Sequence, residues 1–144
     1  MNTIQLNEYS SSYKCTAVQK NYKEFYSWIH KNCDDWNLDT ELKNKIDMTA
    51  EEIFANIVFY AYPAEKGYIE VNMLKNGGNI TLRFTDEGTA YNPLERPDPD
   101  ITLAPERRTP GGLGIFMVKK TASSVNYIRK DNKNILTVEF QIND

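Results

Sequence analysis

The sequence predicts an α+β fold: a two-layer α/β sandwich in which about three helices cover one face of a mixed, mostly antiparallel sheet. Three observations support it. Apolar residues recur with helical spacing up to about residue 62, and from residue 68 they alternate with polar residues, as in strands. A proline-rich stretch then precedes one more helical segment and two final strands. With 144 residues and 40% apolar content, the chain is predicted to form a single domain over residues 1–144.

The first half of the chain is predicted to contain one short strand and two helices. Residues 3–7 (TIQLN) alternate apolar and polar side chains and predict the strand. Apolar residues at i, i+4 and i+7 predict a first helix over about residues 15–33. Asp39 is a good N-cap for a second helix, which should end near Tyr62 because Pro63 follows.

The second half is predicted to be mainly strands. Residues 68–76 and 80–86 both alternate with a period of two and are joined by two glycines, which predicts a β-hairpin. A helix is then predicted at about residues 115–122. Two last strands, residues 124–130 and 135–142, are separated by a turn at the letters DNKN.

A long loop is predicted between the strand at residues 80–86 and the helix at about residues 115–122. Five of the six prolines lie between residues 93 and 110, a density that excludes a helix or a central strand. Loops of that length inside a compact domain are usually functional or disordered.

Composition excludes several classes of protein. The formal net charge of −3 argues against a broad nucleic-acid-binding surface. No apolar run is long enough to cross a membrane, and the first residues have no apolar secretory core. Cys15 and Cys33 are then expected to be reduced thiols in a cytoplasmic protein. With His30 as the single histidine, a zinc site is not expected.

Three separate motifs carry polar or glycine residues where chemistry is possible. Glu52 and Asn56 lie one turn apart on one helix face. Asp86 ends a strand just before Gly88, and TPGGLGIFMVKK (residues 109–120) runs from glycines into a helix. Each has a simpler alternative: a helix-capping glutamate, an ordinary turn and a flexible hinge. Glycines before a helix N-terminus also let backbone N–H groups approach a phosphate.

In combination, these motifs resemble the N-box, G1-box and G2-box of the GHKL ATPase superfamily, whose domain has the Bergerat fold. The segments EEIFANIVFYAYP, FTDEGTAYNP and GGLGIFMVKK carry the resemblance, which spans roughly residues 3–142. Within the superfamily the chain most resembles the small bacterial anti-sigma-factor serine/threonine protein kinases. The sequence lacks the phosphoacceptor helix of a complete histidine kinase.

The resemblance implies a site for ATP and Mg²⁺. Asn56 would give its side-chain oxygen to Mg²⁺, a hard cation that bridges ATP phosphates. Glu52 would act as the catalytic base on the attacking hydroxyl. Asp86 would accept a hydrogen bond from the adenine amino group, and Gly88 would let the backbone pass close to the ring. Thr137 would join Asp86 near adenine, with an ordinary strand threonine as the alternative.

The remaining implied contacts concern the phosphates. The glycine-rich segment would offer backbone N–H groups from Gly111, Gly112, Leu113 and Gly114. Residues 94–110 would form the ATP lid. Its Arg107 and Arg108 would offset charge on the transferring phosphoryl group, unless the segment is simply a solvated charged loop.

The function implied is that of a cytoplasmic anti-sigma factor that is also an ATP-dependent serine/threonine protein kinase in a bacterial partner-switching system. Its partners would be a sigma factor and a STAS-type anti-anti-sigma protein, which it would phosphorylate. The alternative is a nucleotide-binding regulatory module that sequesters a partner without phosphate transfer. A homodimer is implied by the resemblance alone, since the aromatic residues of the first helix are equally suited to the core.

Overall fold

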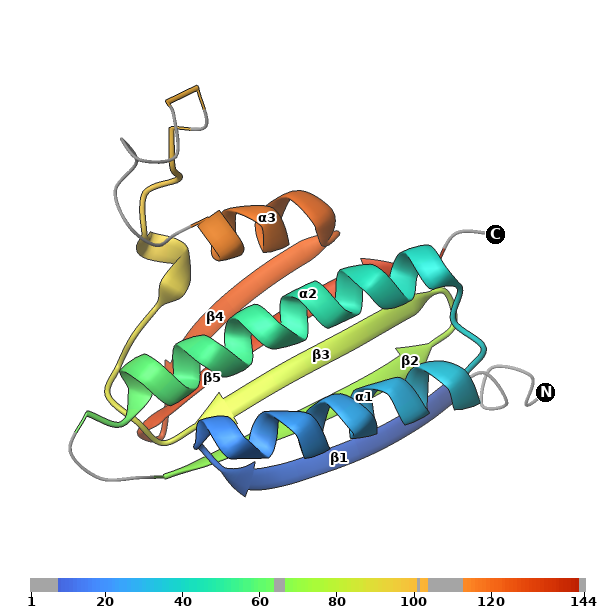
Figure 1. The fold of residues 1–144 in the computed structure, drawn as a ribbon, viewed down its shortest axis with the longest axis horizontal. Coiled ribbons are helices and arrows are strands. Elements are labelled where there is room, and N and C mark those ends of the chain that lie inside the picture. The colour runs from blue at the N-terminus through green and yellow to red at the C-terminus, as the bar shows by residue number, and fades with distance from the viewer. Residues whose placement is uncertain (1–7, 64–66, 101, 104–112, 143–144) are drawn as a thin grey trace.

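A computed structural model gives the fold of the chain and describes residues 8–63, 67–100, 102–103 and 113–142. The helices and strands follow one another in the predicted order (Figure 1). They are β1 (Glu8–Thr16), η2 (Gln19–Asn21), α1 (Tyr22–Asp35), α2 (Thr40–Asn56), η3 (Ile57–Ala61), β2 (Tyr68–Asn76), β3 (Asn79–Asp86), η4 (Pro93–Glu95), α3 (Leu113–Thr121), β4 (Ser124–Lys130) and β5 (Lys133–Gln141).

The strands form one five-stranded sheet in the order β1-β2-β3-β5-β4. Figure 1 shows α1, α2 and α3 on the same face of this sheet, with α1 over β1 and β2 and α3 over β4. The predicted α+β sandwich is therefore confirmed. One detail differs, because all four pairings among the described strands are antiparallel, whereas the sequence analysis expected a mixed sheet.

The first strand and helix differ from the prediction. Residues 8–16 form β1, an edge strand paired along its whole length with β2, where the sequence analysis began a helix at about residue 15. The predicted strand at residues 3–7 lies outside the described residues. Tyr13 and Cys15 pack against the core, but three consecutive serines interrupt the apolar pattern before them. Because the edge strand is mostly polar, its period-two signal was too weak to recognise.

The second helix agrees with the prediction. The Asp39 carboxylate accepts a hydrogen bond from the backbone N–H of Leu42 at 2.8 Å, as expected of an N-cap. After Asn56 the helix widens into the π-helical turn η3, which ends at Ala61. Such turns are rare and are frequently found at functional sites. No helix in the described part of the chain is long and apolar enough to span a membrane.

Two hairpin turns join β2 to β3 and β4 to β5 in the sheet. Gly77, between β2 and β3, has a φ of 60°, which favours glycine. Between β4 and β5 the turn is made by Asp131 and Asn132, with φ of 53° and 63°. The predicted four-residue turn is therefore too long, and Asn134 already belongs to β5. The error in the length of this turn matters for the site described below, because it left Asn134 out of β5.

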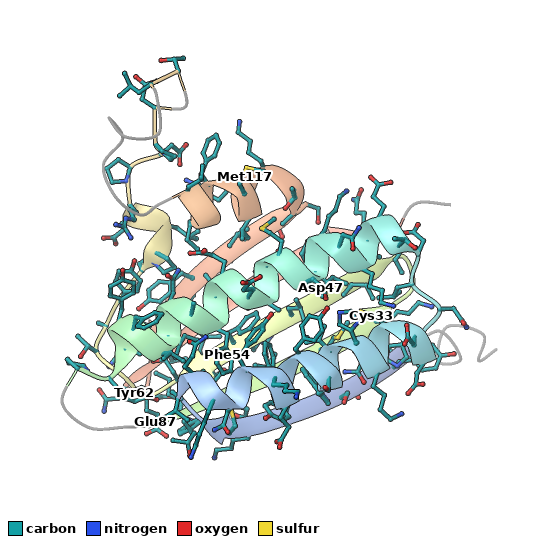
Figure 2. All side chains as sticks on the ribbon, in the orientation of Figure 1. Cys33, Asp47, Phe54, Tyr62, Glu87 and Met117 are labelled. Atoms are coloured by element: carbon teal, nitrogen blue, oxygen red, sulfur yellow. The ribbon has the colours of Figure 1, made fainter. Side chains whose placement is uncertain are left out.

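The core fills the space between the helices and the sheet. Phe54 of α2 stacks on Phe25 of α1 with ring centroids 5.0 Å apart, and Figure 2 labels Phe54 between these two helices. On the sheet side, alternate residues of β3 and β5 point toward the helices, including Phe84 and Leu136. The same phase of both strands therefore supplies the floor of the core and of the candidate site.

Candidate functional site

A pocket lies between the C-terminal half of α2 and the neighbouring ends of β3 and β5. Its empty volume is about 390 Å³. Apolar and aromatic side chains form most of its wall, with a few polar groups among them, as is usual for small-molecule sites. The lining residues are Ile53, Asn56, Ile57, Ala61, Phe84, Asp86, Tyr91, Pro93, Tyr127, Asn134 and Leu136.

Asp86 is the charged group on the pocket wall. Its side chain ends β3 and is buried, with 4% of its surface exposed. The carboxylate oxygen Oδ1 accepts hydrogen bonds from the Gly88 backbone N–H and from the Asn134 side-chain amide, both at 2.9 Å. Burial raises the pKa of the Asp86 carboxyl, while these two bonds and the charge of Arg129 act in the opposite direction.

Asn134 was not singled out by the sequence analysis, although it lies directly across from Asp86 in the pairing of β3 and β5. The sequence analysis placed Asn134 in the predicted turn, so its position beside Asp86 was not recognised. A signal was present, because Asn134 has the same phase as the apolar residues Leu136, Val138 and Phe140. A polar residue in the buried phase of a strand needs hydrogen-bond partners, and that requirement would have identified it.

Thr137 does not line the pocket. It pairs with Arg83 on β3 and with Asn126 on β4, both exposed residues. Strand side chains alternate between the two faces of a sheet, so Thr137 lies on the face opposite to Asp86 and Asn134. The prediction that Thr137 joins Asp86 is therefore wrong, and the alternative of an ordinary strand threonine fits the structure.

The turn after β3 is held against the end of η3, the π-helical turn that continues α2. The backbone N–H of Thr89 donates to the carbonyl of Ala61 at 2.7 Å. A Cβ atom at Gly88 would lie 2.2 Å from the same carbonyl oxygen, so only glycine fits there. The Arg129 guanidinium also donates to the Gly88 carbonyl at 2.7 Å. These contacts fix the backbone at Gly88, whose N–H donates to the Asp86 carboxylate.

The Tyr62 hydroxyl also holds the turn after β3 in place, through two hydrogen bonds to backbone groups. It donates to the Tyr68 carbonyl at 2.7 Å and accepts from the Glu87 backbone N–H at 2.8 Å. Figure 2 shows Tyr62 and Glu87 at the same end of the molecule, where α2 ends and β3 stops. The side chain thus links α2, β2 and the turn that carries Gly88.

Replacing Tyr62 with phenylalanine is expected to destabilise the fold by about 1–2 kcal/mol, because two backbone groups lose their shared partner. Thermal unfolding followed by circular dichroism measures this. The matched control is Tyr60→Phe, since no described residue is hydrogen-bonded to the Tyr60 hydroxyl. A loss of stability that is equal in both variants would contradict the role given to the Tyr62 hydroxyl.

Glu52 lies one turn before Asn56 on the same face of α2, so the two side chains are neighbours. Burial raises the pKa of the Glu52 carboxyl above its ordinary value of 4.5, and the neighbouring Asn56 amide and the charge of Arg96 partly offset this rise. Asn56 itself lines the pocket with Asp86. The structure thus brings together Asn56 and Asp86, with Glu52 beside Asn56.

Gly114 contacts Glu52 at the start of α3. A Cβ atom at Gly114 would lie 1.8 Å from Oε1 of Glu52, so a side chain there would collide with the carboxylate. Gly114 and Leu113 also line a second hollow, which lies between α2 and α3. Its residues are Met48, Glu51, Glu52, Ala55, Leu113, Gly114 and Met117.

Several predicted residues cannot be compared with the structure. Arg107, Arg108, Gly111 and Gly112 lie outside the described residues, as do residues 101 and 104–110 of the predicted lid (residues 94–110). In the described part of that segment, Arg96 is the arginine whose charge acts on the Glu52 carboxyl. No pattern in the sequence distinguished Arg96 from other charged residues of the loop.

Comparison with known protein families agrees with this geometry. The profile of a family described as the histidine kinase-like ATPase domain matches residues 15–140, which is most of the chain. The chain belongs to this family. The histidine kinase-like ATPase fold accounts for the helices on one face of the sheet, and the resemblance noted from the three motifs is confirmed at the level of the family.

Two relatives of this histidine kinase-like ATPase domain are informative. The chain is 26% identical over 106 residues to the serine/threonine-protein kinase BtrW of Bordetella bronchiseptica, covering 73% of each protein. It also resembles the crystal structure of the RsbU and RsbW domains of Rv1364c from Mycobacterium tuberculosis. That likeness has a TM-score of 0.65 and 15% identity, and it covers 93% of this chain and 32% of the other. It supports the fold alone.

Proposed function

We propose that this protein is an ATP-dependent serine/threonine protein kinase that acts as an anti-sigma factor. It would bind a sigma factor and transfer a phosphoryl group to a serine or threonine of an anti-anti-sigma protein, which implies a cytoplasmic location. The observation that carries the proposal is the pocket that Asp86 and Asn56 line together, with the half-buried carboxylate of Glu52 beside Asn56. The similarity to the kinase BtrW supports it.

The base-binding end of the site is the Asp86 end. A carboxylate accepts hydrogen bonds but donates none when ionised, so Asp86 suits the amino group of adenine. The apolar side chains Ile53, Phe84 and Leu136 on the same walls suit the flat faces of the ring. Gly88 keeps the backbone there close to α2 without a side chain in between.

The residues present fit a magnesium ion bound together with ATP. Asn56 lines the pocket, and its side-chain oxygen is the group that would serve a hard cation. Among the described residues, no three histidine, cysteine, aspartate or glutamate side chains gather into a metal site. The ion would be held partly by ATP phosphates, where it would neutralise charge that develops on the transferring group.

Glu52 is the proposed general base. Its carboxylate would take the proton of the acceptor hydroxyl as the oxygen attacks the γ-phosphorus and the bond to the β-phosphate oxygen breaks. Burial favours this role, since a carboxyl whose pKa lies closer to the working pH is a better base. The Asn56 side chain, one turn along the same helix face, would help to orient the carboxylate.

The direct test is a transfer assay with the purified chain, Mg²⁺ and a candidate STAS-type anti-anti-sigma protein. Label from [γ-³²P]ATP should move to a serine or threonine of that protein, and label from [α-³²P]ATP should not. ATP binding without any transfer would overturn the kinase proposal and favour the sequestering module. Gel filtration with a candidate sigma factor, with and without ATP, tests the anti-sigma role separately.

The transfer rate should also depend on pH in a defined direction. Glu52 acts as a base only when ionised, so the rate should rise with pH through the pKa of Glu52, at a pH above the 4.5 of an ordinary glutamate. A pH–rate profile under single-turnover conditions measures this limb. A rate that is constant from about pH 5 to pH 8 would argue against a base with a raised pKa.

A further inference from the structure

Asn134 makes four hydrogen bonds at the base-binding end of the pocket. Its side-chain nitrogen donates to Oδ1 of Asp86 and to the Thr89 carbonyl, both at 2.9 Å. Its side-chain oxygen accepts from the Tyr127 hydroxyl at 2.5 Å and from the Tyr91 backbone N–H at 3.3 Å. Only 6% of Asn134 is exposed, so these partners replace water almost completely.

These four bonds fix the orientation of the Asn134 amide. Its nitrogen faces two acceptors and its oxygen faces two donors, so a flipped amide would lose all four bonds. The amide therefore acts as a donor toward Asp86 in this arrangement. It is held there by side chains and backbone groups of three segments: the end of β3, the turn after β3, and β4.

The same bonds determine which oxygen of Asp86 faces the pocket. Both hydrogen bonds to the Asp86 carboxylate end on Oδ1. Within the described residues, the only fully buried side-chain oxygen or nitrogen without a partner is Oγ1 of Thr49. Since Oδ2 of Asp86 has no protein partner there either, it must reach open space, and the open space beside Asp86 is the pocket.

We propose that Asn134 is a positioning residue that sets the base specificity of this site, with Tyr127 holding it in place. Asn134 occupies Oδ1 and so presents Oδ2 of Asp86 to the purine as an acceptor. An acceptor binds the 6-amino group of adenine and repels the 6-oxo group of guanine or hypoxanthine. This inference rests on the nucleotide site of the proposed function, but it does not require phosphate transfer.

The test compares ATP with ITP, which differs by a 6-oxo group in place of the 6-amino group. Calorimetric titration in Mg²⁺ should show that the wild-type chain prefers ATP by about tenfold or more. Asn134→Asp keeps the side-chain shape but replaces the donor with an acceptor beside Asp86. The two carboxyls should then share a proton. ATP affinity should fall about tenfold, with ITP affinity changed less than about threefold.

Tyr127→Phe is the second variant, and it decides the matter if Asn134→Asp does not fold. It removes one donor to Asn134 and should lower the ATP-to-ITP preference by about threefold. The control is Asn72→Asp, because Asn72 lies on the opposite face of the sheet and bonds to Ser12 at 2.8 Å. This variant should leave the preference unchanged.

The outcomes separate this inference from the proposed function. Variants that melt earlier but keep the wild-type preference would make Asn134 merely structural and overturn the inference. A wild-type chain that binds ATP and ITP equally would do the same, even if it transfers phosphate. A wild-type chain that prefers ATP but transfers nothing would refute the kinase and leave the role of Asn134 intact. Failure to bind either nucleotide would overturn both.

Discussion

Replacing Glu52 with glutamine is expected to lower phosphate transfer by about 10²–10⁴-fold and to change ATP affinity by less than about threefold. Glutamine has the shape of glutamate, but it cannot take a proton. Its neutral side chain still fits against Gly114. Single-turnover transfer and calorimetric ATP titration measure the two effects separately.

Protein stability provides a check on this variant. Burial raises the pKa of Glu52 in the folded state, so at neutral pH its ionised form is less favourable in the folded chain than in the unfolded one. Removing the charge should therefore leave the melting temperature unchanged or raise it. Loss of transfer would then not be due to unfolding.

Glu51→Gln is the matched control for Glu52. Glu51 is the neighbouring residue on α2, is exposed, and carries the same charge. Its replacement should leave transfer within about twofold of the wild type, because Glu51 is exposed to water and its charge is the smallest of the influences on the Glu52 pKa. Equal losses in the two variants would show an effect of overall charge and would remove Glu52 from the role of base.

Replacing Gly88 with alanine is expected to have the largest effect on stability. The new Cβ atom would lie 2.2 Å from the carbonyl oxygen of Ala61 and 2.6 Å from its carbonyl carbon. These are backbone atoms, so the clash cannot be relieved by rotating a side chain. The end of α2 or the turn must move, at a cost of about 3 kcal/mol. Chemical denaturation with a linear extrapolation measures the free energy of unfolding.

The same substitution should weaken ATP binding by about tenfold or more, because the Gly88 N–H holds Oδ1 of Asp86 and a displaced turn loses that bond. Gly78→Ala is the control. A Cβ atom at Gly78 meets nothing within 4 Å, so its effect on stability should stay within about 0.5 kcal/mol. A Gly88→Ala variant as stable as Gly78→Ala would contradict the close approach described for Ala61.

The sequence by itself determined the features that depend on neighbouring residues. Asp39 caps α2 because an aspartate before a helix reaches the backbone N–H three residues later. The hairpin of β2 and β3 follows from strict alternation around Gly77. The placement of Glu52 and Asn56 on one helix face likewise needs only the helical repeat.

The family resemblance could also be recognised from sequence, because its three motifs combine residue types that rarely occur together in that order. The fold class followed from the same patterns and is confirmed. The edge strand β1 could not be predicted, since Ser10, Ser11 and Ser12 carry no apolar signal. Its position comes from pairing with β2, a contact between residues about sixty positions apart.

Only the tertiary structure decided which residue of β5 stands beside Asp86. The apolar phase of β5 places Asn134 and Thr137 on opposite faces, but which residue of the buried phase lies opposite Asp86 depends on the strand register. The turn uses two residues, Asp131 and Asn132, and the register then pairs Asp86 with Asn134. Local preferences fixed the strands, but hydrogen bonding between distant strands fixed the site.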